Sequence, residues 1–258
     1  MAYAAVSKTV EGNLMRVQLP LSAFLIMGKN SPYKWSPHLA YIVGLITTDG
    51  SLSKDKRHID FTSTDLQLLR TFKKCLSLEN KVSEKYASIK SAKKAYHLQF
   101  SDVSFYNWLL SIGLMPNKTY HLGKINIPGL YFKDFLRGNL DGDGSIFTYI
   151  DRYMHYKGVR YKYTRIYTAF NSASYKYLRW IRNTLKKELN IKGALNSWLR
   201  NKKCVSAWTL RFAKNESLKL LSWLYYKPGL PCLNRKRKIA EKFLLGITWK
   251  QCTKLHRS

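Results

Sequence analysis

Two aspartates that share a local sequence context are the strongest candidates for chemistry in this chain. Asp49 lies in segment 44–52 and Asp143 in segment 138–146, and both segments place glycine, apolar and acidic residues in a similar order. Each follows an apolar stretch that predicts a helix, and the glycine after each aspartate favours a helix end. We therefore expect both carboxylates at helix C-termini, where the helix dipole disfavours negative charge and a nearby cation would compensate.

The repeat predicts two copies of one structural unit packed about a pseudo-twofold axis. Gly44 and Gly138 would then lie at equivalent positions, where the absence of a side chain allows two helices to approach closely. Asp49 and Asp143 would converge at one end of this helix pair. Converging carboxylates repel each other unless divalent cations lie between them, and hard oxygen ligands favour Mg²⁺.

Segments 42–50 and 136–144 resemble the two motifs of a single-chain LAGLIDADG homing endonuclease. The resemblance rests on the glycine at the third motif position, the acid at the eighth and the glycine at the ninth. Thr47 replaces the usual acid at the sixth position of the first copy, and Asn139 replaces an apolar residue at the fourth position of the second. These departures concern the packing of the two helices rather than the chemistry.

The resemblance implies an α+β fold in which a pseudo-twofold pair of αββαββα half-domains joins two central motif helices to a DNA-binding β-saddle. We expect an N-terminal extension at residues 1–35, a first half-domain at 36–127 and a second at 128–258. The implied activity is staggered cleavage of both strands at a long asymmetric site, with Mg²⁺ held by Asp49 and Asp143. Mn²⁺ or Ca²⁺ could substitute for binding, and no backbone carbonyl ligand is assigned.

Local patterns agree with this order of elements. Ser36 and Pro37 are start signals for the first motif helix. The rest of the first half predicts a strand at 58–62, a helix from Thr64 or Asp65 to Cys75, strands at 81–88 and 95–101, and a helix at 103–112. The second half repeats several of these segments in the same order, as in 61–64 with 170–173, 95–100 with 207–212, and 108–109 with 223–224.

The charge of the chain favours a nucleic-acid partner. It has 45 lysines and arginines against 15 acids, a net charge of +30, in a sequence that is 45% hydrophobic. A folded protein this basic binds polyanions readily, the alternatives being a solvated basic surface or a membrane-surface binder. The four cysteines show no CxxC spacing, which favours a reduced intracellular environment, whether bacterial, archaeal or organellar, and the apolar run at 39–46 is far too short to cross a bilayer.

A long predicted hairpin at 146–169 is the main candidate for DNA contact. It mixes arginine, lysine and tyrosine, and a two-stranded ribbon fits the major groove. The alternative is a basic edge that discourages aggregation. The predicted DNA-binding residues, all basic and placed on strands or hairpin turns, are Lys54, Lys56, Arg57, Lys85, Lys90, Lys93, Lys94, Arg152, Lys157, Arg160, Lys162, Arg165, Arg200, Lys202 and Lys203.

Lys118 and Lys236 end the two halves at matching positions and are predicted to assist catalysis beside the two aspartates, by stabilising charge or organising water. Lys236 also has a simpler interpretation, because it lies in the charged run 235–238, and such runs are usually solvated. Asp141 lies in a stretch that begins like an EF-hand loop, but Ile150 occupies the position that needs glutamate. Asp141 is therefore predicted to be a helix-end or interface residue.

Two other functions remain open at this level. One is an RNA-binding intron maturase, for which host intron RNA would be a partner besides double-stranded DNA. The other is a DNA-binding regulator that no longer cleaves, although a pure binder has no use for two carboxylates that face phosphates. A monomer without membrane contact is expected in each case. Gln99 and Arg211, at matching strand positions, are as compatible with a structural role as with a catalytic one.

Overall fold

The computed structural model describes residues 33–85, 94–156, 159–198 and 207–246, and residues Trp35–Ser258 form one compact unit. The elements of the first half are α2 (Pro37–Asp49), β1 (Gly50–Leu52), β2 (His58–Ser63), α3 (Leu66–Cys75), β3 (Ser83–Lys85), β4 (Ala95–Ser101) and α4 (Val103–Ser111). Those of the second half are α5 (Gly129–Asp141), β5 (Ser145–Tyr156), β6 (Val159–Ser172), α6 (Tyr175–Leu189), β7 (Ala194–Trp198), β8 (Ala207–Phe212), α7 (Lys214–Leu224) and α8 (Asn234–Leu244).

Each half contains one antiparallel four-stranded sheet. The strand orders are β1-β2-β4-β3 and β5-β6-β8-β7, so the two sheets have equivalent topology. Both halves follow the order αββαββα, and α8 is an additional helix at the end of the second. The predicted α+β class is confirmed. The strand expected at 81–88 is described only as the three residues of β3.

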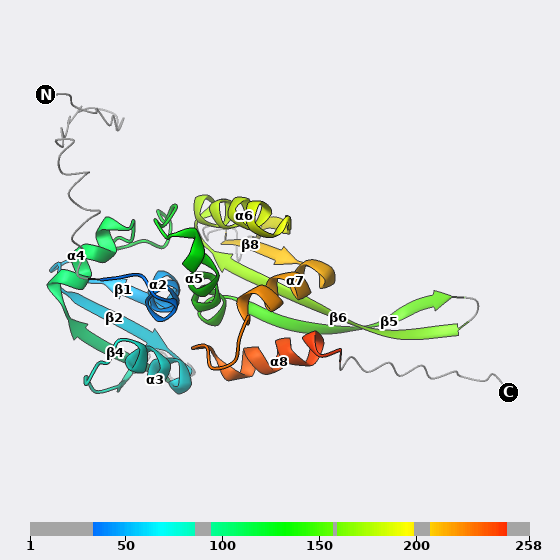
Figure 1. Ribbon diagram of the computed structural model, residues 1–258, viewed down its shortest axis with the longest axis horizontal. Helices are drawn as coiled ribbons and strands as arrows, with labels where there is room; N and C mark the ends of the chain where they lie inside the picture. Colours follow the sequence, from blue (N-terminus) through cyan, green and yellow to red (C-terminus); the bar gives the residue numbers. More distant parts are fainter. Residues whose placement is uncertain (1–32, 86–93, 157–158, 199–206, 247–258) are drawn as a thin grey trace, which may run out of the picture. The chain divides into compact units, whose positions relative to one another are not determined.

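Local signals set several boundaries as expected. The Ser36 hydroxyl accepts a hydrogen bond from the Leu39 amide and Pro37 is the first residue of α2, which confirms the predicted start. The Asp65 carboxylate accepts from the Gln67 amide and caps α3. The second hairpin is long, because β5 and β6 continue beyond the rest of their sheet (Figure 1).

The centre of the unit is the contact between α2 and α5, which lie side by side in Figure 1. A Cβ atom added to Gly44 would lie 2.1 Å from the Phe135 carbonyl oxygen, and one added to Gly138 would lie 2.1 Å from the Tyr41 carbonyl oxygen. Both distances are too short for any real Cβ. The predicted close approach at the two glycines is confirmed, and it requires the glycines because the opposing atoms are backbone.

The two motif residues that depart from the family pattern are buried and hydrogen-bonded in this contact. The Asn139 side-chain amide donates to the Gly44 carbonyl oxygen at 3.3 Å, across the two helices. The Thr47 hydroxyl donates to the Val43 carbonyl oxygen of its own helix at 2.6 Å. Because a buried polar group is costly only when it lacks a partner, both substitutions are compatible with tight helix packing.

The end of α5 differs from the prediction. The helix ends at Asp141 and is capped by Gly142, so Asp143 lies beyond the helix instead of at its C-terminus, and Gly144 is not the stop residue. The local reason is a close approach: a Cβ on Gly142 would lie 2.0 Å from the Thr48 hydroxyl oxygen and 2.7 Å from Asp49 Oδ2. Any larger residue at position 142 would require the Thr48 and Asp49 side chains to move.

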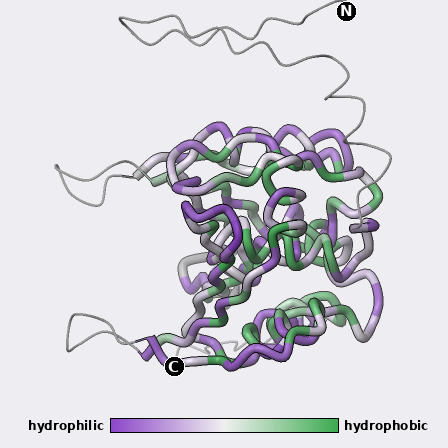
Figure 2. Tube along the Cα trace, turned by 90° about the vertical axis from the view of Figure 1, so that its left-hand side faces the viewer, coloured by the Kyte–Doolittle hydropathy of each residue, from purple (hydrophilic) through white to green (hydrophobic). Residues whose placement is uncertain are grey.

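Each sheet has one apolar face that is covered by helices. In the first sheet Phe61 and Leu98 are fully buried, and the Phe61 ring stacks on Phe72 of α3 with a centroid distance of 4.4 Å. In the second sheet Phe170 and Leu210 are buried in the same way. Hydrophobic stretches accordingly run through the middle of the unit (Figure 2). The opposite face of each sheet carries the polar residues, because side chains alternate along a strand.

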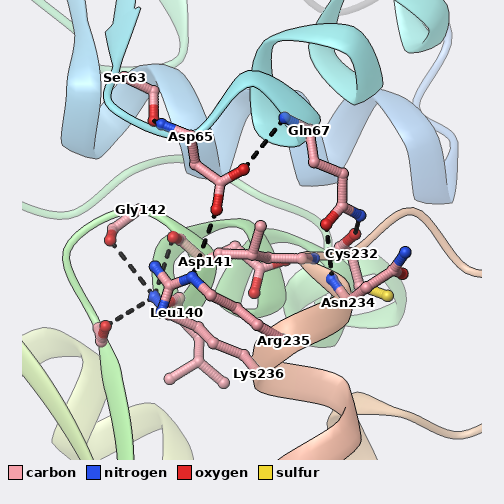
Figure 3. A network of polar contacts seen from close by, with 12 residues as sticks. Ser63, Asp65, Gln67, Leu140, Asp141, Gly142, Cys232, Asn234, Arg235 and Lys236 are labelled. Carbon is pink, nitrogen blue, oxygen red and sulfur yellow. Dashed lines mark hydrogen bonds and ion pairs between the residues drawn. The ribbon is translucent and has the colours of Figure 1, made fainter. Parts of the chain in front are cut away.

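The segment before α8 joins the second half to α3 of the first. The Gln67 side chain donates to the Cys232 carbonyl oxygen at 3.1 Å and accepts from the Asn234 amide at 3.1 Å. The Arg235 guanidinium lies 3.3 Å from the Asp65 carboxylate (Figure 3). These contacts fix the N-terminus of α8 and therefore the position of Lys236.

No helix in the described ranges has the length and apolarity that a bilayer span requires.

Candidate active site

The two motif aspartates form an electrostatically coupled pair. The pKa of Asp49 is raised to about 7, mainly by burial and also by the charge of Asp143. Lys236 and Lys118 oppose this shift, so both lysines act on the same carboxylate. The structure therefore brings together the four residues to which the sequence assigned catalysis, and Asp49 is half-buried at the last position of α2.

Asp143 is the more exposed of the two aspartates. Its side chain is exposed, and its pKa is raised by partial loss of hydration, which Lys118 and Lys236 oppose. Its backbone is held by a polar relay that the sequence did not predict: the Asn171 amide donates to the Asp143 carbonyl oxygen at 3.1 Å, and the Thr209 hydroxyl donates to Asn171 Oδ1 at 2.7 Å. The sequence indicated Asn171 only as part of segment 170–173, which repeats segment 61–64, and gave no sign of these two hydrogen bonds.

The two lysines bind equivalent backbone atoms in the two halves. Lys118 Nζ donates to the carbonyl oxygen of Gly50, and Lys236 Nζ donates to that of Gly144 at 2.7 Å. These glycines directly follow the two aspartates. Each lysine therefore holds the backbone beside the acid of its own half, and this supports the pseudo-twofold relation that the sequence repeat predicts.

Lys236 is bound more completely than Lys118. Its side chain is only 4% exposed, and it also donates to the carbonyl oxygens of Leu140 at 2.5 Å and Asp141 at 2.9 Å (Figure 3). The ammonium group thus supplies the cation expected at the C-terminus of α5. Reading Lys236 as part of a solvated run was wrong. Burial lowers its pKa to about 8 and also lowers the pKa of the half-buried Lys118.

Asp141 is an interface residue, as predicted, and lies 2% exposed. One of its oxygens accepts from the Tyr41 hydroxyl of α2 at 2.9 Å and from the Leu233 amide at 2.7 Å. Burial raises its pKa to about 6, and Lys236 opposes the shift. Asp141 therefore joins α2, α5 and the segment before α8, and the sequence alone did not predict its two partners.

The donor set fits a hydrated hard cation. Within the described ranges no three histidine, cysteine or acidic side chains form a group that could hold a metal ion. Burial and the charge of Asp143 raise the pKa of Asp49, and Lys236 and Lys118 lower it. Mg²⁺ is typically held by one or two carboxylates and keeps several waters, so Asp49 and Asp143 match its needs.

A cavity of about 240 Å³ adjoins Asp49. Its lining includes Thr62 of β2, Ala95 of β4, and Arg235 at the start of α8. Thr62 and Ala95 lie on the sheet face opposite to the one that α3 and α4 cover, because side chains alternate along a strand and the buried residues Phe61 and Leu98 point to the covered face. The uncovered face of the first sheet is therefore continuous with the acidic pair.

The structure gives partners to several predicted DNA-binding residues. Arg165 binds Asp151, with its two nitrogens 2.8 and 3.1 Å from one carboxylate oxygen. Lys85 contacts Asp60 at 3.5 Å and Thr62 at 3.2 Å. Because these cations are partly neutralised within the protein, they contribute less attraction for phosphate than the net charge suggests. Lys94 likewise pairs with a carboxylate, that of Glu84.

Other predicted DNA-binding residues are exposed or lie outside the description. Lys54, Lys56 and Arg57 are exposed on the turn between β1 and β2, and Arg152 is exposed on β5. Arg160 and Lys162 belong to β6, but their side chains are outside the described part, as are the residues Lys90, Lys93, Lys157, Arg200, Lys202 and Lys203. DNA contact by all of these residues stays a prediction.

Gln99 and Arg211 are exposed, and the Arg211 guanidinium lies 5.5 Å from the Tyr167 ring centroid.

The raised pKa of Asp49 predicts the pH dependence of stability. The pKa of Asp49 is about 7 in the folded protein and ordinarily 3.8, so between these two pH values the folded protein binds more protons than the unfolded chain. The free energy of unfolding of the metal-free protein should therefore fall as pH rises from about 4 to about 7. Asp49→Asn should reduce this slope in denaturant titrations with chelator. Equal slopes in both proteins would contradict the assignment.

Residues 36–111 match the family described as LAGLIDADG-like domain. The fold resembles solved structures of the I-SmaMI LAGLIDADG homing endonuclease bound to cleaved DNA (10% identity, TM-score 0.54, 84% of this chain and 91% of the other). It also resembles the I-LtrWI LAGLIDADG homing endonuclease bound to target DNA (15% identity, TM-score 0.51, 81% and 89%). No protein of curated function matches the chain at a significant level.

The full-length DUF199/WhiA structure from Thermatoga maritima is a further match, at 18% identity and a TM-score of 0.46. This match covers 87% of the present chain but only 66% of that one. Identities this low define the fold and nothing finer. The chain thus has the fold of solved LAGLIDADG structures, with a LAGLIDADG-like domain in its first half.

Proposed function

We propose that this protein is a metal-dependent endonuclease that cuts both strands of duplex DNA at a specific site. The observation that carries the proposal is the coupled pair Asp49 and Asp143 with Lys118 and Lys236 around it. Two carboxylates of raised pKa, one of them made harder to ionise by the charge of the other, next to two lysines of lowered pKa, are typical of a reaction centre rather than of a structural ion pair. A LAGLIDADG fold allows the function but does not specify it.

Hydrolysis of a phosphodiester needs an activated water, stabilisation of the negative charge on phosphorus, and a proton for the leaving oxygen. A divalent cation, most simply Mg²⁺, would be held by Asp49 and Asp143, and would supply Lewis acidity and a water of lowered pKa. The protein's part is to favour the ionised forms of both carboxylates against the effect of their burial. Lys118 and Lys236 favour the ionised forms, since both lower the pKa of Asp49.

The different surroundings of the two lysines suggest different roles. Lys236 is surrounded by backbone carbonyl oxygens, so it acts on the carboxylates at a distance and positions the end of α5. Lys118 is half-buried, and the one hydrogen bond of its ammonium group among the described residues goes to Gly50. An ammonium group has three donors, so Lys118 can also bind a phosphate oxygen.

The partner we propose is double-stranded DNA, bound on the uncovered faces of the two sheets. The net charge of +30 supports a polyanion, and the cavity beside Asp49 continues onto the uncovered face of the first sheet. The I-SmaMI and I-LtrWI structures contain DNA, which supports the same class of partner here. Staggered cleavage at a long asymmetric site, a monomeric state and a role in intron homing are finer parts of this proposal.

A selection from a randomised duplex library tests the proposal. The protein is incubated with the library in Mg²⁺ or in chelator, and cut ends are sequenced. We expect one long sequence to be cut, only with metal, on both strands. Tight binding to duplex without cutting would favour a DNA-binding regulator. Binding to structured RNA with no preference for duplex DNA would favour a maturase, and either result would overturn the endonuclease.

A further inference from the structure

A negatively charged side chain lies in the middle of a surface that the proposed function assigns to DNA. Asp60 of β2 has its side chain on the uncovered face of the first sheet, because its neighbours Ile59 and Phe61 are fully buried on the other face. The Asp60 side chain is 21% exposed. A carboxylate in this place repels phosphates, so it needs a different reason to lie there.

Three side chains hold the Asp60 carboxylate in one orientation. His97 Nδ1 lies 3.0 Å from Oδ1, while the Thr62 hydroxyl lies 3.3 Å and Lys85 Nζ 3.5 Å from Oδ2. Lys85 also donates to the Thr62 hydroxyl at 3.2 Å, which closes the cluster. An ionised carboxylate has about four acceptor sites, so one remains for another donor. The cluster is pre-oriented before any ligand binds.

The position of Asp60 places it near the acidic pair. Ser51, the second residue after Asp49, is directly opposite Asp60 in the β1–β2 ladder. Gln99 is directly opposite Asp60 on its other side, in the β2–β4 ladder. Thr62, which holds Asp60, lines the cavity beside Asp49. A row of three polar residues across adjacent strands therefore begins next to the proposed reaction centre.

Double-stranded DNA offers few groups that a fixed carboxylate can bind. In the major groove the hydrogen-bond donors of the bases are the amino groups at cytosine N4 and adenine N6. We propose that Asp60 recognises one of these amino groups and so determines the preferred base at one position near the cut. Gln99, the cross-strand neighbour of Asp60, supplies an amide to the same or the adjacent base pair. This inference rests on the proposed function, which it deepens.

A binding selection distinguishes this inference from the proposed function. The full chain is used with chelator, so that bound duplexes stay intact, and the base preference is measured at every position. We expect the wild-type protein to prefer cytosine or adenine at a position close to the centre. In Asp60→Ala this preference should fall by about tenfold, the discrimination expected of one base contact, while other positions keep theirs.

Asp60→Asn is a second variant that retains size and tests the same point if the alanine variant does not fold. Because an asparagine pairs with both N6 and N7 of adenine, the ratio of adenine to cytosine at that position should rise about tenfold. Asp55→Asn is the matched control. Asp55 also contacts a histidine, His58, but lies on the turn between β1 and β2 outside the sheet.

The possible outcomes separate clearly. An unchanged base preference in both Asp60 variants, or a loss of binding that is equal at all positions, would overturn the inference and leave the cluster as an internal ion pair. A wild-type protein that selects no sequence would overturn the proposed specificity, and the inference with it. A change at one position in the Asp60 variants, absent in Asp55→Asn, would support both.

Discussion

Asp143→Asn should remove DNA cleavage while leaving DNA binding intact. Asp143 is exposed beside Asp49, and its replacement leaves a single carboxylate to hold a cation. We expect a loss in cleavage rate of at least about a hundredfold, the effect of removing one preorganised polar group from a reaction centre. Binding should be unchanged or slightly tighter, since the variant repels phosphate less. The measurements are single-turnover cleavage of the selected duplex and a binding titration in chelator.

A matched control removes the same charge elsewhere. Glu241→Gln affects an exposed carboxylate of α8 that pairs with Arg237, away from the aspartates. This variant should cut at the wild-type rate. If Asp143→Asn also cuts at that rate, the assignment of Asp143 as a metal ligand is wrong. If Asp143→Asn and Glu241→Gln both lose cleavage, the effect comes from the loss of a negative charge and not from the reaction centre.

Gly138→Ala should destabilise the folded protein strongly, although alanine is the better helix former. The new Cβ would lie 2.1 Å from the Tyr41 carbonyl oxygen, and backbone cannot move aside as a side chain can. The two helices must then separate, which disturbs the Asn139 to Gly44 hydrogen bond and the convergence of the aspartates. We expect the free energy of unfolding to fall by about 3 kcal/mol, at the upper end of overpacking effects.

Gly129→Ala is the control on the same helix. Gly129 is the first residue of α5, and a Cβ there would meet no atom within 4 Å. It should therefore leave stability unchanged or raise it by up to about 1 kcal/mol through helix propensity. Urea unfolding of the two variants measures the difference. Equal midpoints for Gly138→Ala and Gly129→Ala would show that the helices can separate at little cost, contrary to the close contact described here.

Several features of the fold could be predicted because local sequence signals determine them. Ser36 and Asp65 were identifiable as helix caps, since capping depends only on the next few residues. Gly44 and Gly138 indicated a close helix contact because they recur at the same motif position. The end of α5 was predicted wrongly. The helix stops at Asp141 because Gly142 lies against Thr48 of α2, and a contact between distant segments cannot be read from a local sequence pattern.

The candidate site shows the same division. Asp49, Asp143, Lys118 and Lys236 could be proposed from repeated spacing alone, and the structure brings them together. The hydrogen-bond partners of Lys236 could not be predicted from the sequence, because its carbonyl acceptors lie more than 90 residues earlier in the chain. The hydrogen bond of Asn171 to the Asp143 backbone was not predicted either. The same holds for the ion pairs of Arg165 and Lys85, which partly neutralise two of the predicted DNA-binding residues.

By itself, the sequence predicted the two motif helices and the paired residues of the candidate site, because these follow from short-range periodicity, capping and repetition, and the resemblance of the two motifs implied the class of fold. Only the tertiary structure decided which charges are buried, which are paired, and that the Asp60 carboxylate keeps one acceptor site for a further hydrogen bond. Those properties depend on atoms brought together from distant segments, as Asp60, Lys85 and His97 are on the first sheet. The solvation that sets the pKa of Asp49 and Lys236 arises in the same way, from packing.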